Sequence, residues 1–373
     1  MNLDEILTMA VNEGASDIHI KINTPPLVRI NKRLVKLVDK EININDIDIF
    51  LDYIVQTERH RKHLEEFGEI DLSYSISGVS RFRVNIYRQR GSYAFAFRTL
   101  KMDIPDIDSL HLPKKLYDIA LEKRGIVLVT GPTGTGKSTT LASMINYRNK
   151  MIDDVIITLE DPIEYVFRDN KSYIVQREIG IDTQEFATAL KAALREDPDV
   201  IMVGEMRDLE TIETALRAAE TGHLVFSTLH TTDAKETINR IIDVFPKDSQ
   251  NHIRLLLAST LKAVISQRLI PRSDQPGLVP AVEILLNQGA VFDAIQDPDK
   301  FVQIDELMEK GHKQYGMQTF DQSIMDLYER GYISKEDALL YATNPSDLAL
   351  KMKGISSGEF SDEFFYRQQG SNE

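Results

Sequence analysis

Apolar residues in the first hundred positions change from helical to strand spacing and back. Residues 3–10 repeat at the helical period and stop before Gly14, whereas residues 18–22 alternate as in a half-buried strand. A further strand, a helix and a meander of three strands follow, predicted over 27–37, 47–54 and 72–100. The pattern therefore predicts a small α+β domain at residues 1–99.

The pattern changes after residue 113 to short β-branched apolar runs separated by helical segments. Strands are predicted at 125–130, 155–159, 200–203 and 224–227, with helices between them at 139–146, 183–195 and 209–221. Strands that alternate with helices indicate βα units and a parallel sheet, so this part is assigned to the α/β class. After Pro246 the chain is predicted to be mainly helical.

The length of the chain fits two domains. The 373 residues are enough for two hydrophobic cores. Residues 100–113 contain two prolines and several charged side chains, which predicts a linker into an α/β domain at 114–353. Residues 354–373 are rich in Ser, Gly and acidic side chains and are predicted to form a flexible tail.

Residues 131–138 match the phosphate-binding sequence G-x-x-x-x-G-K-[ST]. The motif lies between a predicted strand and a predicted helix, as binding requires. Glycines let backbone N–H groups curl around an anion, and the helix directs its unpaired N–H groups and positive dipole end to the same point. The predicted phosphate-binding residues are Gly131, Pro132, Thr133, Gly134, Thr135, Gly136, Lys137, Ser138 and Thr139.

Lys137 and Ser138 have separate expected tasks in this loop. Lys137 can reach the β- and γ-phosphates as a point charge, and the Ser138 hydroxyl is placed to coordinate Mg²⁺. A glycine-rich turn without a ligand is the alternative, but the strand, the spacing, the lysine and the serine all agree. The sequence therefore predicts binding of a nucleoside triphosphate with Mg²⁺.

Carboxylates follow two of the predicted parallel strands. Glu160 comes directly after the strand at 155–159, and Glu205 lies just past the strand at 200–203. Ligands of open α/β sheets bind at the carboxyl ends of the strands, and phosphoryl transfer needs a proton acceptor and metal ligands. One acid is expected to be the base and the other the metal partner. A helix cap or a solvated loop is the alternative for each.

Two histidines flank the last of these strands. His230 comes just past it and can sense the γ-phosphate, with a structural role as the alternative. A structural role is the preferred interpretation for His223. Neither histidine has a second His or Cys at the spacing of a transition-metal site, so no such site is predicted.

Two arginines of the meander are predicted to face each other. If the strands on either side of Arg90 and Gly91 pair as a hairpin, Arg83 lies opposite Arg98. Like charges at directly opposed positions repel, so the arrangement makes more sense if an anion binds between them. We therefore expect a phosphate contact outside the loop, with two solvated arginines as the alternative.

Composition adds charge and exclusions to this picture. The formal net charge is −14, which argues against a nucleic-acid partner because such surfaces are usually basic, and favours a protein partner. The sequence has no Cys, which excludes disulfides and thiolate zinc sites. No apolar run approaches the length of a membrane span and the N-terminus is acidic, so we expect a cytosolic protein.

Four motifs in this order resemble those of the secretion ATPase superfamily, and most closely the type IV pilus retraction ATPases of the PilT type. Residues 131–138 resemble the Walker A loop, 158–164 the aspartate box, 197–208 the Walker B segment and 222–233 the histidine box. Residues 15–20 resemble the opening of the family's PAS-like N-terminal domain.

The resemblance implies a PAS-like domain at 1–99 and a RecA-like ATPase domain at 114–353, in a homo-hexamer that uses ATP and Mg²⁺. It implies the catalytic base, the Walker B carboxylate near Mg²⁺ and two arginines that close on the phosphates, which are Glu160, Glu205, Arg83 and Arg98 in this sequence. The implied partners are an inner-membrane platform protein and, indirectly, pilin. The protein is then expected in the cytoplasm, at the inner face of the membrane.

Retraction is favoured within the superfamily because assembly and type II secretion ATPases generally carry an extra N-terminal domain and a four-cysteine zinc module. Residues 315–322 also resemble retraction enzymes. Residues 289–296, in contrast, lack both arginines of the family's retraction motif Ala-Ile-Arg-Asn-Leu-Ile-Arg-Glu. The alternatives are an assembly or secretion ATPase, a DNA-translocating motor and a non-catalytic scaffold gated by nucleotide.

Overall fold

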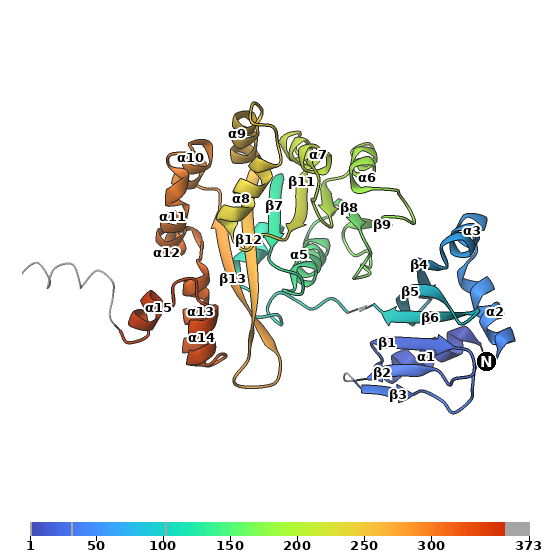
Figure 1. The fold of residues 1–373 in the computed structure, drawn as a ribbon. Helices are drawn as coiled ribbons and strands as arrows, with labels where there is room; N and C mark the ends of the chain where they lie inside the picture. Colours follow the sequence, from blue (N-terminus) through green and yellow to red (C-terminus); the bar gives the residue numbers. More distant parts are fainter. Residues whose placement is uncertain (1, 31–32, 101–102, 355–373) are drawn as a thin grey trace, which may run out of the picture. The chain divides into compact units, whose positions relative to one another are not determined.

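The computed structural model describes residues 2–30, 33–100 and 103–354, which fold into two compact units (Figure 1). The first unit comprises Met1–Ile104 and Pro162–Arg168, and the second comprises Pro105–Asp161 and Asp169–Glu373. The predicted domain bounds, 1–99 and 114–353, stay a prediction. The predicted tail lies outside the described residues except for Gly354.

The first unit is built on a six-stranded sheet in the order β3-β2-β1-β6-β5-β4, in which every neighbouring pair is antiparallel. Phe50 and Phe95 pack edge to face, 6.3 Å apart, in its buried core. Its elements are α1 (Leu3–Asn12), β1 (Asp17–Lys21), β2 (Leu27–Ile30), β3 (Arg33–Lys36), α2 (Ile44–Ile54), α3 (Glu58–Phe67), β4 (Glu69–Ile76), β5 (Ser80–Gln89) and β6 (Ser92–Thr99).

Polar side chains set where the helices of this unit begin. The side chain of Asn2 accepts a hydrogen bond at the start of α1, and that of Thr57 does so at the start of α3. Asn43 and Asp46 form a reciprocal capping box at α2. Each such cap contributes about 1 kcal/mol. Helix α3 was not predicted because six of its ten residues are charged, and only Leu64 of it is buried.

The prediction of one strand over 27–37 is wrong. The structure has two antiparallel strands there, β2 and β3, with Ile30 opposite Arg33.

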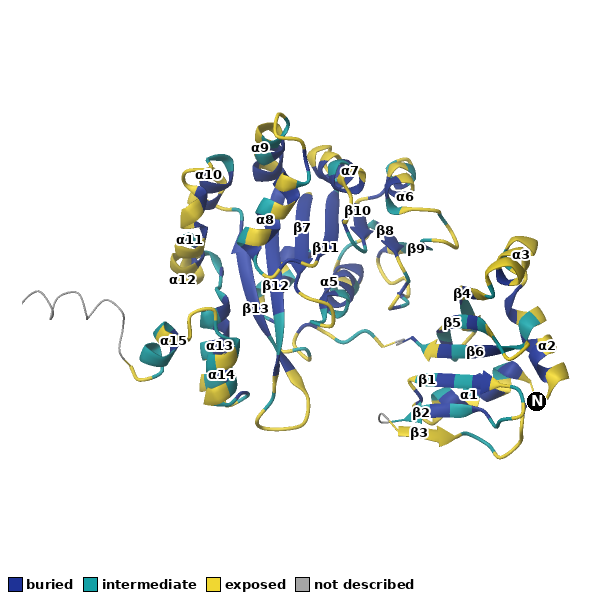
Figure 2. Cartoon of the chain, viewed as in Figure 1, coloured by how far each residue is buried: buried dark blue, intermediate teal, exposed yellow. Residues whose placement is uncertain are grey.

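The second unit is built on a seven-stranded sheet in the order β13-β12-β7-β11-β10-β8-β9. All neighbouring pairs are parallel except β12 and β13. The central strands β7 (Gly125–Thr130), β10 (Val200–Val203) and β11 (Leu224–Leu229) are buried along their whole length, as Figure 2 shows in dark blue. Burial on both faces explains why these strands appear in the sequence as continuous apolar runs.

Helices cover both faces of this sheet. Gln267 of β12 donates a hydrogen bond to Thr140 of α5 (Lys137–Met151). Glu283 lies opposite Ser266, the residue before Gln267, and accepts a hydrogen bond from the start of α8 (Ala234–Asp243). Since successive strand residues point to opposite faces, α5 and α8 lie on opposite faces. The other elements are α4 (Lys115–Ala120), β8 (Val155–Glu160), β9 (Tyr173–Glu178), α6 (Phe186–Ala193), α7 (Leu209–Glu220) and α9 (Gln250–Thr260).

The prediction of a mainly helical chain after Pro246 agrees with most of this part, but it missed two long strands, β12 (Leu261–Pro271) and β13 (Leu278–Leu286), which extend the sheet. Buried polar residues, Ser266, Gln267 and Glu283, interrupt their apolar runs and hide the strand pattern. Helices do follow, namely α10 (Ala290–Gln296), the 3-10 turn η1 (Phe301–Gln303), α11 (Ile304–Lys310), α12 (His312–Tyr315), α13 (Phe320–Glu329), α14 (Lys335–Tyr341) and α15 (Pro345–Lys351).

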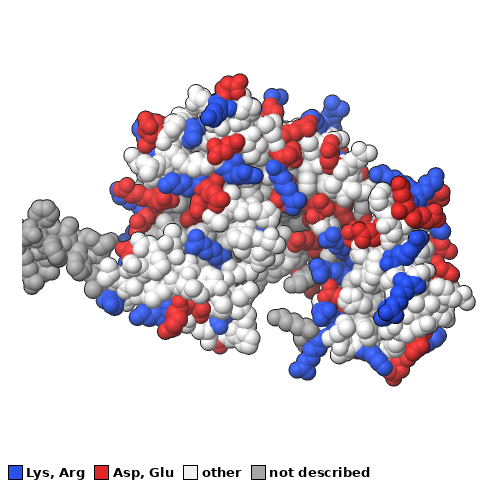
Figure 3. Space-filling model, viewed as in Figure 1, with Lys and Arg blue, Asp and Glu red and all other residues white. Residues whose placement is uncertain are grey.

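The surface carries both signs of charge. On the face drawn in Figure 3, Lys and Arg side chains lie among Asp and Glu side chains instead of forming one basic tract. In the described part of the chain, every helix is too short or too polar to cross a lipid bilayer.

Candidate nucleotide-binding and active site

Four parallel strands end together at one edge of the second unit's sheet. Leu229 of β11 pairs with Thr130 of β7, and Val203 of β10 pairs with Leu159 of β8. The residues at or just past these ends are the phosphate loop, His230, Glu205 and Glu160. The structure thus brings together the predicted site residues of this unit at the edge where open α/β sheets bind ligands.

The phosphate loop needs glycine at its first position. Gly131 has a φ of +142°, and a Cβ placed on it would lie 2.6 Å from the backbone oxygen of Gln267 and 2.7 Å from the hydroxyl of Thr135. No other residue fits that space. The loop can therefore lie directly against β12, and its amide groups stay free of side chains.

Lys137 lies inside the curve of the loop. Its Nζ donates hydrogen bonds to the carbonyl oxygens of Gly131 (2.7 Å) and Pro132 (3.1 Å), and the residue is only 9% exposed. Ser138 follows in the first turn of α5, whose N-terminus opens onto the loop. A buried ammonium beside a helix N-terminus is the charge arrangement that holds phosphate groups.

Side-chain hydrogen bonds on both faces of the sheet fix the base of the loop. The hydroxyl of Thr130 donates to that of Ser266 (3.0 Å), and the amide of Gln267 donates to the hydroxyl of Thr140 (2.9 Å). All four residues are buried. The start of the loop and the first turns of α5 are therefore both tied to β12.

Glu160 is a buried carboxylate held by two donors. Its Oε1 accepts hydrogen bonds from the hydroxyl of Thr158 (2.7 Å) and from the amide of Gln176 on β9 (3.1 Å). The residue is 6% exposed. Two donors that point at the same carboxylate oxygen orient the side chain, as a general base requires.

Glu205 is bracketed by two cationic or ionisable groups. Arg207 lies 2.7 Å from its Oε2, and Nε2 of His230 lies 3.0 Å from its Oε1. Partial burial raises the pKa of the Glu205 carboxyl, but Arg207 and His230 outweigh it and hold the pKa below its ordinary value. Glu205 is therefore ionised at neutral pH.

Gly204, directly before Glu205, packs closely against β8. A Cβ on Gly204 would lie 3.1 Å from the carbonyl oxygen of Leu159, and its amide already donates to that oxygen over 2.7 Å. Its own carbonyl accepts from the hydroxyl of Thr228 over 2.6 Å. A side chain here would therefore require the backbone of β8 to give by a few tenths of an ångström.

His223 lies at the opposite end of β11 from His230. Its Nδ1 is 3.0 Å from the carbonyl oxygen of Ala218, so it anchors the turn between α7 and β11. This contact agrees with a structural role.

Arg83 and Arg98 lie in the first unit. The predicted hairpin register is confirmed, with Arg83 of β5 directly opposite Arg98 of β6. Each arginine also has an acidic neighbour that sequence reasoning missed, Asp71 at 3.8 Å from Arg83 and Asp17 at 3.1 Å from Arg98. These carboxylates offset the repulsion, so an anion is not needed to explain the pair.

A cavity of about 360 Å³ borders the phosphate loop. Thr135, Gly136, Thr139 and Thr140 form its floor beside the loop. The apolar part of its lining consists of Leu110, Leu112, Leu269, Leu278 and Pro280, and the polar side chains of His111, Arg272 and Gln275 also line it. The cavity can take a flat, partly apolar group attached to phosphates held in the loop.

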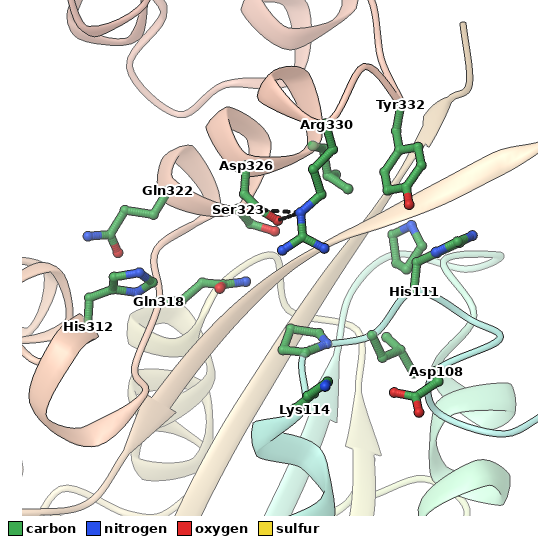
Figure 4. Close-up of a pocket in the computed structure, with 14 residues that line it drawn as sticks. Asp108, His111, Lys114, His312, Gln318, Gln322, Ser323, Asp326, Arg330 and Tyr332 are labelled. Atoms are coloured by element: carbon green, nitrogen blue, oxygen red, sulfur yellow. Dashed lines mark hydrogen bonds and ion pairs between the residues drawn. The ribbon is translucent and has the colours of Figure 1, made fainter. Parts of the chain in front are cut away.

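A second cavity, of about 440 Å³, shares His111, Leu112 and Pro280 with the first (Figure 4). Figure 4 shows Arg330 beside Asp326, and the Arg330 Nε donates to that carboxylate over 3.0 Å. Arg272 lies 2.9 Å from Nε2 of His111 and packs over the ring of Tyr332. Arg272 lines the loop cavity, whereas Asp326, Arg330 and Tyr332 line the second cavity.

Sequence reasoning missed several residues that hold the site. Arg207 stands two positions after Glu205, a spacing that allows a local ion pair, and this was the available signal. Gln176 lies on β9, an edge strand that was not predicted because Tyr173 at its start is exposed and most of its residues are only half-buried. The contact of Gln267 with α5 had no sequence signal, because the two are distant along the chain.

Comparison with known proteins fits this geometry. Residues 1–279, three quarters of the chain, match the model of a family described as "Type II/IV secretion system protein". The chain belongs to the type II/IV secretion system protein family. The prediction that it is an ATPase of the secretion superfamily is confirmed by this match and by the relatives below.

Two curated relatives of this family member resemble it over most of their length. A protein of Pseudomonas aeruginosa named "Type IV pilus retractation ATPase PilT" is 42% identical over 93% of this chain and 100% of its own length. A protein of Neisseria gonorrhoeae named "Twitching motility protein" is 44% identical over 87% of this chain and 86% of its own length.

A solved structure agrees with the fold. The structure titled "Crystal Structure of the Pilus Retraction Motor PilT and Bound ADP" superimposes with a TM-score of 0.84 at 48% identity, covering 93% of this chain and 98% of that one. The α/β fold of this secretion-family ATPase is therefore the fold of a protein that binds a nucleotide.

Proposed function

We propose that the chain is a motor ATPase that hydrolyses ATP to power retraction of a type IV pilus. One observation carries the proposal: the phosphate loop, Glu160, Glu205 and His230 all lie at one edge of the second unit's sheet. The relatives named for pilus retraction and twitching supply the biological direction.

The loop and the carboxylates divide the chemistry of hydrolysis. Lys137 and the loop amides hold the β- and γ-phosphates, and Glu160 accepts the proton of the attacking water. Hard oxygen ligands suit Mg²⁺, and the Ser138 hydroxyl with the ionised Glu205 supplies them, directly or through water. Bound there, Mg²⁺ would neutralise charge on the phosphates during transfer. His230, in contact with Glu205, senses the γ-phosphate.

The cavity beside the loop suits the rest of the nucleotide. Its leucine and proline side chains suit the faces of a purine ring. Thr139 and Thr140, which follow the phosphate loop in the sequence, also line the cavity. The bound group is then a complete nucleoside triphosphate instead of inorganic phosphate alone.

The first unit, proposed to be the PAS-like domain at 1–99, supplies Arg83 and Arg98. The second, proposed to be the RecA-like domain at 114–353, supplies the loop. Arginines that move onto the transferring phosphate raise rates by about 10³–10⁵ in related chemistry, enough to couple movement to hydrolysis. A homo-hexamer at the inner face of the membrane would pass this movement to a platform protein and, through it, to pilin.

The segment at 289–296 bears on the direction of movement. Gly289 is followed by α10, so a helix stands where the family's retraction motif is expected, without its two arginines. Arg254 of α9 donates to the carbonyl oxygen of Ile295 in α10 over 3.1 Å. An arginine from a neighbouring helix thus contacts the backbone of this segment.

Two experiments test the function. ATPase assays on the wild type and Glu205→Ala, with and without DNA, should show activity that DNA does not change and that the substitution removes. Equal activity of the two proteins would favour a scaffold, and stimulation by DNA would favour a translocating motor. Deleting the gene should leave pili to accumulate on cells, whereas loss of pili would indicate an assembly ATPase.

A further inference from the structure

The segment that carries His230 is short and leads directly into a helix. Nε2 of His230 lies 3.0 Å from Glu205, and α8 begins four residues later at Ala234. The side chain of Asp233 caps this helix by accepting from the amide of Glu236 over 2.7 Å. Any displacement of the start of α8 therefore moves the contact between His230 and Glu205.

Hydrogen bonds make this segment one unit with the first turn of α8. The hydroxyls of Thr231 and Thr237 are 2.6 Å apart, and the amide of Thr232 donates to the Glu236 carboxylate over 2.7 Å. All of these bonds lie within residues 231–237. They fix the segment to the helix but leave its position on the sheet to other contacts.

Glu283 of β13 holds residues 231–237 and the start of α8 against the sheet. Its Oε1 accepts a hydrogen bond from the backbone amide of Ala234 over 2.8 Å, and the residue is 6% exposed. This amide is one of the N-terminal donors that a helix cannot satisfy internally. A carboxylate at a helix N-terminus also interacts favourably with the helix dipole.

We propose that Glu283 is a positioning residue, which holds the start of α8 against the sheet and thereby sets the contact between His230 and Glu205. The proposal rests on the proposed function, because it gives the His230 segment its task in ATP hydrolysis. Glu283 is not among the residues that line the loop cavity, and it pairs with Ser266 of β12, which in turn pairs with Thr130 at the end of β7.

The protonation of Glu283 adds a testable pH dependence. Burial raises the pKa of Glu283 to about 7, helped by the carboxylates of Asp233 and Asp305 and opposed by the Ala234 amide and by Arg268. Lys235, also near this group, pairs with Asp305 at 3.0 Å. A charged acceptor binds an amide more strongly than a neutral one, so the segment is held more firmly above pH 7 than below it.

Three substitutions in the full-length protein separate positioning from general stability. Glu283→Leu removes the acceptor, and kcat for ATP should fall about tenfold, as for other outer positioning groups, with KM unchanged. Glu283→Gln keeps a neutral acceptor, so it should retain most of kcat but lose the change in kcat around pH 7. Ser323→Ala is the matched control. The hydroxyl of Ser323 in α13 accepts a buried hydrogen bond from the amide of Val282, the neighbour of Glu283 on β13, over 3.0 Å, and the substitution removes this bond.

Hydrogen exchange of residues 230–236 gives a readout that does not need hydrolysis. Exchange should be faster in Glu283→Leu than in the wild type and unchanged in Ser323→Ala. An inactive wild type would defeat the proposed function, yet the exchange comparison would still decide the role of Glu283. Equal exchange rates in Glu283→Leu and Ser323→Ala would overturn the proposal. A wild-type dependence of kcat on pH in Glu283→Gln would overturn it as well. If Glu283→Leu does not fold, this measurement on Glu283→Gln still tests the proposal.

Discussion

The two regions proposed to contact phosphate are built in opposite ways. In the second unit, Lys137 and Glu160 are nearly inaccessible, and each is held by at least two hydrogen bonds. In the first unit, the side chains of Arg83 and Arg98 are 44% and 69% exposed, and each has one acidic neighbour. One region is preorganised, and the other is free to exchange partners.

This difference matches what a motor needs from each region. Preorganised groups in a buried site stabilise developing charge without rearrangement at the moment of reaction. Exposed arginines with weak partners can leave them for a phosphate at little cost, because exposed ion pairs contribute only about 0.2–1 kcal/mol. In the proposed function, the buried region of the second unit holds the nucleotide, and the exposed arginines of the first unit report on it through movement.

The largest expected effect comes from the exposed arginines. The double substitution Arg83→Ala and Arg98→Ala should lower kcat by about 10³-fold or more, because arginines at a transferring phosphate contribute that much. Nucleotide binding to the loop, measured with a fluorescent ADP, should remain. Arg88→Ala on the same strand, where the arginine packs over Tyr93, is the control and should hydrolyse ATP normally. Normal turnover in the double variant would leave the pair as solvated arginines.

The next largest effect is expected in the buried region. Glu160→Gln should lower kcat by about 10²-fold or more through loss of the base, while the amide can still accept from Thr158 and Gln176. Steady-state assays with ADP titration would show unchanged binding. Glu178 of β9 lies opposite Glu160 and is also buried, so Glu178→Gln is a matched control that should hydrolyse ATP normally. Equal loss in both variants would point to charge balance in the sheet instead of base catalysis.

Sequence predicted the preorganised region well because local rules build it. Gly125–Thr130 and Val200–Val203 are strands with the predicted bounds, since continuous β-branched runs indicate burial on both faces. Glu160 and Glu205 could be expected side by side because carboxyl ends of parallel strands meet at one edge. The hairpin register of Arg83 and Arg98 followed from one turn.

What sequence did not predict depends on contacts distant along the chain. The strands β12 and β13 were missed because Ser266, Gln267 and Glu283 are polar yet buried, and only tertiary partners satisfy them. Asp17 was not expected beside Arg98 because β1 pairs with β6 across most of the first unit's sequence. Such pairings have no local signal, so the supporting residues of both regions came only from the structure.

An effect of intermediate size is expected on the pH dependence of stability, through the buried carboxyl group of Glu283. With the folded pKa raised from 4.5 to about 7, the folded state favours the protonated form, so the wild type should lose stability as the pH rises through this range. Glu283→Gln cannot ionise at this position and does not lose this stability. Its free energy of unfolding should therefore rise by about 3 kcal/mol relative to that of the wild type between pH values below 4.5 and above 7. Urea unfolding at a series of pH values measures the difference. A gap that does not change with pH would show that Glu283 is ionised throughout.

The smallest effect is expected at the acidic neighbours of the exposed arginines. Burial raises the pKa of the Asp17 carboxyl, but Ser16 and Arg98 outweigh it and hold the pKa below 3.8. Its contribution to stability is therefore present at neutral pH and is lost as the pH falls through the lowered pKa. Asp17→Asn should cost about 1 kcal/mol or less at pH 7, in the range of exposed ion pairs, and the gap to the wild type should close in acid. ATPase activity should not fall, because the substitution frees Arg98 and weakens contacts only with Ser16 and Arg29 besides. A large loss of activity with intact stability would mean that Asp17 holds Arg98 in its working position, and the exposed region would then be preorganised as well.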